Sequence, residues 1–92
     1  MKAIWKDVIL AESDLTVSIE GNHYFPPESI NRKFFSESQT HTRCGWKGIG
    51  SYYTIKVNDD INQDSAWYYP EPLDKARNIK NYVAFWKGIK VE

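Results

Sequence analysis

The sequence predicts a mainly β fold, of the β-rich α+β class, with one or two short helices. Short runs of alternating apolar and polar residues are separated by Gly, Asn, Asp and Pro, the pattern of strands joined by turns. The chain has 92 residues, of which four are Trp, six Tyr and four Phe. A domain of this size buries only about 60–65% of the surface of its unfolded chain, so a core needs most of these rings. We expect one domain, residues 1–92.

The N-terminal half carries the shorter predicted elements. Val17 and Ile19 fall on one face of an alternating run, which is typical of a half-buried strand. Ile30 and Phe34 are four residues apart, which suits one face of a short helix. The elements expected here are two short strands or one bent strand at 3–6 and 8–11, a strand at 16–20, a turn at 21–22, one or two helical turns at 28–35 and a polar loop at 36–40.

The C-terminal half carries the longest predicted strand, residues 46–57. Asn58, Asp59 and Asp60 after it have turn chemistry, which predicts a hairpin. The elements expected are the strand 46–57, its return strand 61–69 ended by Pro70 and Pro72, a short helix with Leu73, Ala76, Ile79 and Val83 at helical spacing, and extended chain over 82–91 with a bend at Gly88.

The dipeptide Trp-Lys occurs three times, at Trp5, Trp46 and Trp86. The second and third copies continue as Lys-Gly-Ile. So short a match does not indicate a duplicated unit. We interpret the three copies as three strands that use similar side chains.

The balance of charges argues against a nucleic-acid partner. Twelve Lys and Arg residues are matched by twelve Asp and Glu residues. Binding to nucleic acid by neutralising phosphates needs a basic surplus or a basic stripe. The segment Gly45–Gly50 is also neither a phosphate-binding loop nor a dinucleotide fingerprint, because a strand and not a helix is predicted after it.

Cysteine usage and the N-terminus predict a cytoplasmic protein without a membrane segment. Cys44 is the single cysteine, so no internal disulfide can form. The first residues lack the apolar stretch of a signal peptide, and the longest aliphatic run near them, Val8 to Ala11, is far too short to span a bilayer.

The segment from His41 to Gly50 has the highest density of polar, aromatic and glycine residues. In extended conformation, His41, Arg43 and Lys47 share one face of a strand. Thr42, Cys44 and Trp46 share the other, which has the composition of a core. The basic row could be a cradle for an anion or a set of solvated charges.

Cys44 is a weak candidate for a nucleophile. A reactive thiol needs a base within about 3 Å and a lowered pKa. His41 and Lys47 each lie three residues away, an odd offset that places them on the opposite face of a regular strand. An inert, buried cysteine is the competing interpretation. One cysteine and two histidines do not make up the usual four ligands of a structural zinc, so we expect no metal and no cofactor.

Four motifs carry a resemblance to a known family. They are, in chain order, Gly21-Asn22-x-Tyr24-Phe25-Pro26, His41-Thr42-x-Cys44-x-Trp46-Lys47-Gly48-x-x-x-Tyr52, Ala66-Trp67-Tyr68-Tyr69-Pro70-x-Pro72 and Tyr82-Val83-Ala84-Phe85. Together they resemble the domain-of-unknown-function family 427, and they span nearly the whole chain. The resemblance implies a small, mostly bacterial protein or module with a strongly coiled antiparallel sheet, like a half-barrel or tent.

The family is sometimes labelled nucleotidyltransferase-like, so the resemblance also implies that activity as an alternative. Transferases of the polymerase-β type place Gly-Ser at the start of a helix, followed by an Asp-x-Asp pair that holds metal ions. Here Gly50 and Ser51 continue into a strand, and Asp59-Asp60 lies in a predicted turn. Gly45 also stands where family members often have proline.

Our leading hypothesis from the sequence is a domain that binds a small anionic or polar ligand. Its predicted ligand-binding residues are Glu20, Tyr24, Arg32, His41, Lys47, Tyr52 and Trp67. Arg32 and Lys47 would neutralise an anionic group, while rings would form an apolar wall. The alternatives are an enzyme centred on Cys44 or Lys47, and a protein-interaction module that presents the aromatic segment from Trp67 to Pro72.

Overall fold

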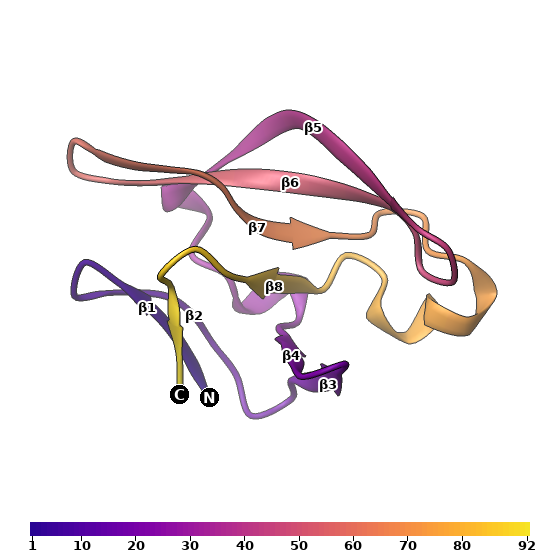
Figure 1. Ribbon diagram of the computed structural model, residues 1–92. Helices are drawn as coiled ribbons and strands as arrows, with labels where there is room; N and C mark the ends of the chain where they lie inside the picture. The colour runs from indigo at the N-terminus through magenta and orange to yellow at the C-terminus, as the bar shows by residue number, and fades with distance from the viewer.

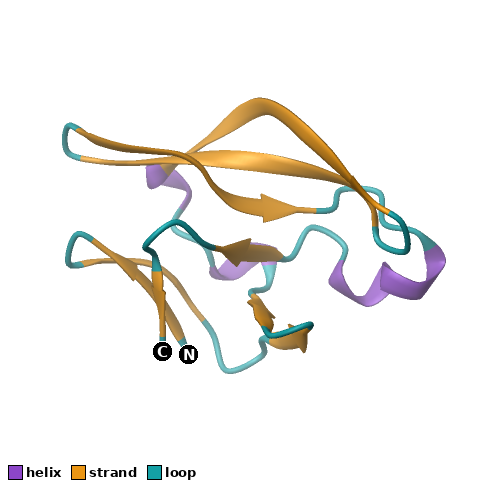
Figure 2. Ribbon diagram, viewed as in Figure 1, coloured by secondary structure: helices purple, strands orange, loops and turns teal.

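Strands make up 58% of the computed structural model, which describes residues 1–92, and the mainly β prediction is confirmed (Figure 2). The strands are β1 (Lys2–Trp5), β2 (Val8–Glu12), β3 (Val17–Ile19), β4 (Asn22–Tyr24), β5 (Phe35–Cys44), β6 (Gly48–Val57), β7 (Asp60–Tyr68), β8 (Val83–Phe85) and β9 (Lys90–Val91). The helical segments are three short 3-10 stretches, η1 (Pro27–Ser29), η2 (Arg32–Phe34) and η3 (Asp74–Ile79).

The strands form three separate antiparallel sheets, with the orders β2-β1-β9, β3-β4 and β5-β6-β7-β8 (Figure 1). None of them is closed or strongly curled, so the expected half-barrel or tent-like sheet is wrong. Prolines follow two of the strands. Pro26 and Pro27 come after β4, Pro70 and Pro72 come after β7, and proline cannot donate to a strand ladder.

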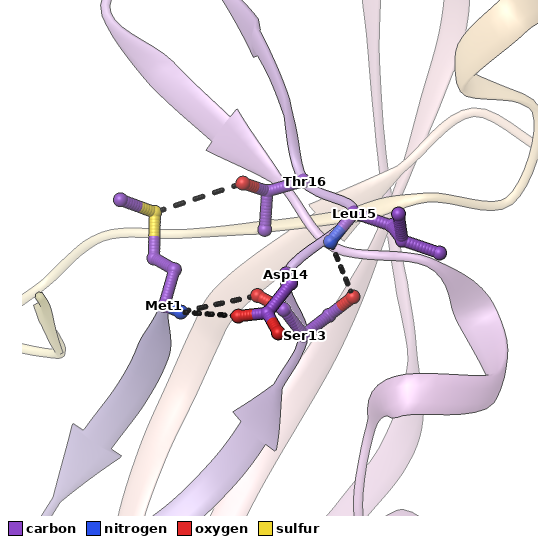
Figure 3. Close-up of polar contacts among 5 residues, drawn as sticks. All are labelled: Met1, Ser13, Asp14, Leu15 and Thr16. Carbon is purple, nitrogen blue, oxygen red and sulfur yellow. Dashed lines mark hydrogen bonds and ion pairs between the residues drawn. The ribbon is translucent and has the colours of Figure 1, made fainter.

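The three-stranded sheet brings the two ends of the chain together (Figure 1). Lys2 and Glu92 exchange two backbone hydrogen bonds, of 2.7 and 2.9 Å. The amino group of Met1 donates to the carbonyl oxygen of Ser13 at 3.1 Å and lies 4.0 Å from the Asp14 carboxylate (Figure 3). The terminal residue is therefore attached to the segment that follows β2.

Side chains of the four-stranded sheet alternate between two faces. The residues that pair across β6, β7 and β8 are Tyr53, Ala66 and Phe85 on one face, and Tyr52, Trp67 and Ala84 on the other. We call the first the core face and the second, which carries a cavity, the pocket face. All three residues of β8 are buried, so both faces are covered at this strand.

The two faces are covered by different elements. Twelve buried residues form a cluster on the core face, where Ala3, Leu10 and Ala11 of the three-stranded sheet meet residues such as Ile55 and Phe85. Five buried residues form the cluster on the pocket face: Tyr24 from the β3–β4 hairpin, Tyr69, Ala76 and Ile79 of η3, and Ala84. The smaller cluster leaves room beside it for the cavity.

Two predicted boundaries of the long strands are wrong. Residues 36–40, expected as a loop, belong to β5, the edge strand of its sheet. Six of the ten residues of this strand are exposed polar side chains, so the apolar alternation that marks a strand is missing. Trp46, expected inside a strand, lies in the turn before β6.

The predicted helices are confirmed only as short 3-10 stretches. The stretch 28–35 divides into η1 and η2, because Ile30 between them is extended, with φ −86° and ψ 146°. In η3, Ala76 and Ile79 are buried as the spacing predicts, but Leu73 is exposed and Val83 lies in β8. The hairpin predicted at 58–60 is confirmed, with Val57 paired to Asp60.

All three Trp-Lys dipeptides lie at the ends of strands and not inside them, contrary to our interpretation. Each one occurs where the chain turns: Trp5 is the last residue of β1, Trp46 follows β5 and Trp86 follows β8. Each lysine lies over its own tryptophan, with Nζ 5.6, 5.0 and 5.1 Å from the ring centroids of Trp5, Trp46 and Trp86. The shared dipeptide thus marks a turn that is capped by a cation–π contact.

Candidate functional site

A cavity of about 250 Å³ opens on the pocket face of the four-stranded sheet. Four sheet strands or the turns after them contribute to it, together with the β3–β4 hairpin. The lining residues are Asn22, Tyr24, Cys44, Lys47, Tyr52, Trp67, Tyr69 and Trp86. Five of the eight are aromatic, and Lys47 is the single charged group among them.

Lys47 reaches the cavity because the chain turns between β5 and β6. Cys44 pairs with Gly48 across this turn, so Cys44 and Lys47 line the same cavity although a regular strand would place them on opposite faces. Gly48 has φ +112°, which residues with a Cβ rarely adopt. The Lys47 carbonyl also accepts a hydrogen bond of 2.9 Å from the backbone N–H of Leu73, which fastens the turn to the segment before η3.

The ammonium group of Lys47 is paired with the carboxylate of Glu20. Lys47 Nζ donates a short hydrogen bond to Glu20 Oε1. This bond lowers the pKa of Glu20, and the positive charge of Lys47 acts in the same direction. Burial by itself would lower the pKa of Lys47, but the bond to Glu20 and the charges that nearby Tyr24 and Tyr69 gain on ionisation raise it. Both partners are therefore charged at neutral pH.

The rings of the cavity wall hold one another by edge contacts and hydrogen bonds. Trp67 lies edge-on to Tyr24 and to Trp86, with centroids 6.2 and 5.9 Å apart, and its Nε1 donates to the Tyr24 hydroxyl at 3.3 Å. Tyr69 lies beneath Lys47, whose Nζ is 5.8 Å from the ring centroid. Burial raises the pKa of Tyr69 to about 12. The rings of the wall are thus held in place by one another and are uncharged, and Lys47 supplies the one charge beside them.

The structure brings five of the seven predicted residues together. Tyr24, Lys47, Tyr52 and Trp67 line the cavity, and Glu20 joins them through Lys47. The other two lie elsewhere. Arg32 is exposed in η2 and lines none of the surface depressions.

His41 lies on the other face of the sheet from the cavity. It lines a separate depression of about 270 Å³ with Ile49, Ser51, Pro70 and Glu71. Its Nδ1 is 3.2 Å from the hydroxyl oxygen of Ser51, its partner in the cross-strand register. The expected row of His41, Arg43 and Lys47 is therefore divided by the turn, which moves only Lys47 to the pocket face.

Apart from Cys44, which was considered only as a nucleophile, three lining residues were not among the predicted ligand-binding residues: Asn22, Tyr69 and Trp86. Each lies inside or beside a motif that the sequence contains. Tyr69 shares strand parity with Trp67, and Trp86 belongs to the second copy of Trp-Lys-Gly-Ile. The sequence therefore contains a pattern that marks each of these residues. Strand parity alone did not show that the tryptophan of the Trp-Lys-Gly-Ile copy at Trp86, and not the one at Trp46, would line the cavity.

The geometry gives less support to a Cys44 nucleophile, to a metal site and to an exposed aromatic surface than to the cavity. Cys44 is half-buried in the cavity wall, and no side chain forms a hydrogen bond with its sulfur. No three His, Cys, Asp or Glu side chains lie close enough together to hold a metal ion. In the aromatic segment from Trp67 to Pro72, Tyr69 is buried, Glu71 is exposed and the other four residues are half-buried. No helix of the chain could cross a membrane.

The fold and the cavity define a small, mainly β domain with a ring-lined pocket that contains one charge pair. A family model described as "Domain of unknown function (DUF427)", with the label NTP_transf_9, matches residues 1–92. The chain therefore belongs to the DUF427 family, as its motifs indicated. No curated protein matches the sequence.

Proposed function

We propose that this protein binds a small polar or anionic molecule in the cavity of the pocket face. The observation that carries the proposal is the convergence of five aromatic side chains on one nearly buried ammonium group. Ligand pockets are mostly apolar, with a few polar groups that fix the orientation of the ligand, and this cavity has that composition.

The size of the cavity limits the ligand. Pockets for drug-sized molecules have volumes of roughly 300–1,000 Å³, and this one is about 250 Å³. A molecule on the order of one ring with one polar substituent is the appropriate size. Its flat body would lie against Tyr52, Trp67 or Trp86, and its polar group would face Lys47.

A catalytic function at the same cavity is a separate hypothesis. Cys44 or Lys47 would be the reacting group, and both line the cavity. A binding function needs only the rings and the charge pair, whereas a thiol nucleophile also needs a base in hydrogen-bond reach. Cys44 has no such partner, so the binding function is the better supported of the two.

Ligand titration tests the proposal. Small carboxylates, phosphates and neutral ring amides are screened by thermal shift, and each hit is titrated while tryptophan fluorescence and backbone amide NMR shifts are recorded. Hits should perturb the signals of Trp67, Trp86 and the turn before Gly48, and Tyr52→Ala should weaken them about tenfold, the loss of roughly 1.4 kcal/mol of ring contact. A screen without hits, or shifts that map to the His41 depression, would overturn the proposal.

A further inference from the structure

The two partners of the Glu20–Lys47 pair differ in their access to solvent. The side chain of Lys47 is 8% exposed, and that of Glu20 is 55% exposed. The ammonium group is thus part of the cavity wall, while the carboxylate reaches it from outside. Glu20 itself does not line the cavity.

The two partners also differ in how firmly they are held. Lys47 belongs to the turn that Leu73 and the β5–β6 ladder fasten. Glu20 lies at the tip of the β3–β4 hairpin, where Glu20 and Gly21 have φ of +54° and +82°, as a tight two-residue hairpin turn requires. Buried Tyr24 anchors the far end of this hairpin, whereas Glu20 and Gly21 at its tip are exposed.

The charge of Lys47 needs a partner. A buried ammonium without a counter-charge is strongly unfavourable, whereas an exposed carboxylate without a partner is solvated by water at little cost. The carboxylate of Glu20 can therefore be replaced on Lys47 by another anion, but Lys47 cannot be left alone. A ligand that brings its own anionic group into the cavity satisfies Lys47 and releases Glu20 to solvent.

We propose that the Glu20 carboxylate occupies the place of the ligand's anionic group, and that the pocket takes ring-bearing anions by exchange of that group for Glu20 on Lys47. This inference rests on the proposed binding function and adds to it a ligand class and a specificity-determining residue. Glu20 competes with anionic ligands, which must replace it on Lys47, whereas neutral ring compounds bind beside an intact Glu20–Lys47 pair.

The experiment compares benzoate with benzamide, which have the same shape and differ in charge. Their dissociation constants are measured by tryptophan fluorescence and NMR for the wild type, Glu20→Gln, Glu20→Ala and Lys47→Met. Removing the competing charge should tighten benzoate binding to both Glu20 variants about tenfold, which corresponds to roughly 1.4 kcal/mol. Benzamide binding should change less than about twofold in these variants, and Lys47→Met should lose the preference for benzoate.

The outcomes separate the two proposals. Benzamide binding in the cavity without any benzoate binding, or benzoate binding that weakens when Glu20 is replaced, would overturn the exchange and leave the ligand pocket in place. If neither probe bound wild type or either Glu20 variant, the ligand pocket and the exchange would both be rejected. Thermal unfolding of each variant at neutral pH controls for loss of fold.

Discussion

The core face and the pocket face of the four-stranded sheet are both formed by β6, β7 and β8, but their side chains differ in burial and charge. On the core face, Tyr53, Ile55 and Phe85 are buried against a second sheet, and the cluster contains no charged residue. On the pocket face, the rings of Tyr52, Trp67 and Trp86 are only partly covered, and Lys47 lies among them. Adjacent residues in one strand therefore serve stability and, as we propose, binding.

This difference shows how a small domain can spare aromatic residues for a ligand. One large cluster carries most of the buried apolar surface, since it has twelve buried members against five on the other face. The pocket face can then keep rings partly exposed, because the core face supplies most of the free energy of unfolding. If so, substitutions on the core face should lower stability more than substitutions on the pocket face.

The largest effect is expected from truncating a ring on the core face. Phe25 is fully buried, with its ring centroid 5.6 Å from that of Phe85. Phe25→Ala should lower the free energy of unfolding by about 3–5 kcal/mol, measured by urea denaturation. The matched variant on the pocket face, Trp86→Ala, should cost less than half as much, because Trp86 is half-exposed. Equal losses would contradict the division between the faces.

An alkaline loss of stability should come from the pocket face. Burial raises the pKa of Tyr69 to about 12, from an ordinary 10. The unfolded chain therefore loses this proton first as the pH rises, so stability is complete below pH 10 and falls up to about pH 12. The raised pKa of Lys47 acts in the same direction.

The Tyr69 contribution is on the order of 3 kcal/mol, and denaturation curves recorded between pH 9 and 12 would measure it. Tyr69→Phe removes the titrating hydroxyl and keeps the ring. This variant should show a shallower alkaline decline than the wild type. An unchanged decline would mean that Tyr69 is not the group that holds its proton in the folded state.

The turn that carries Lys47 offers a pair of glycines for comparison. Gly48 has φ +112°, and a Cβ there would lie 3.4 Å from both the Glu71 carbonyl oxygen and the Leu73 nitrogen. Gly48→Ala should cost about 1–3 kcal/mol. Gly45→Ala, in the same turn but with nothing within 4 Å of a Cβ, should stay within about 0.5 kcal/mol of the wild type. Thermal unfolding of both variants would measure the difference.

The smallest effects are expected at the two predicted residues that lie away from the cavity. Arg32→Ala and His41→Ala should leave the affinity for benzoate within about twofold of the wild type, less than about 0.4 kcal/mol. His41 also tests the division directly, because it projects from the opposite face of the same sheet. A tenfold loss in His41→Ala would mean that ligands use the depression beside Ser51 instead.

The elements that sequence patterns predicted well are those with strong local signals. The hairpin at 58–60 and the alternation of Tyr52 with Tyr53 followed from turn chemistry and strand periodicity, and both are confirmed. The strand over 36–40 was missed because an edge strand exposed on its outer side needs no apolar alternation. The structure brings five of the seven predicted ligand-binding residues together and leaves Arg32 and His41 apart, because motif composition marks side chains but not their direction.

Composition and periodicity alone determined that this chain would be a mainly β domain, and they marked Glu20, Tyr24, Lys47, Tyr52 and Trp67 together with Arg32 and His41. The rings expected in the core are less deeply placed than predicted: five of the fourteen are buried, and six more are partly buried against the two clusters. Tertiary structure alone decided that the strands divide into three sheets and that Lys47 lies beside Cys44 and not beside His41. The physical reason is that strand parity is a local property, while a turn can transfer a side chain to the other face of a sheet. Only the pairing of Cys44 with Gly48 across such a turn fixes which face Lys47 joins.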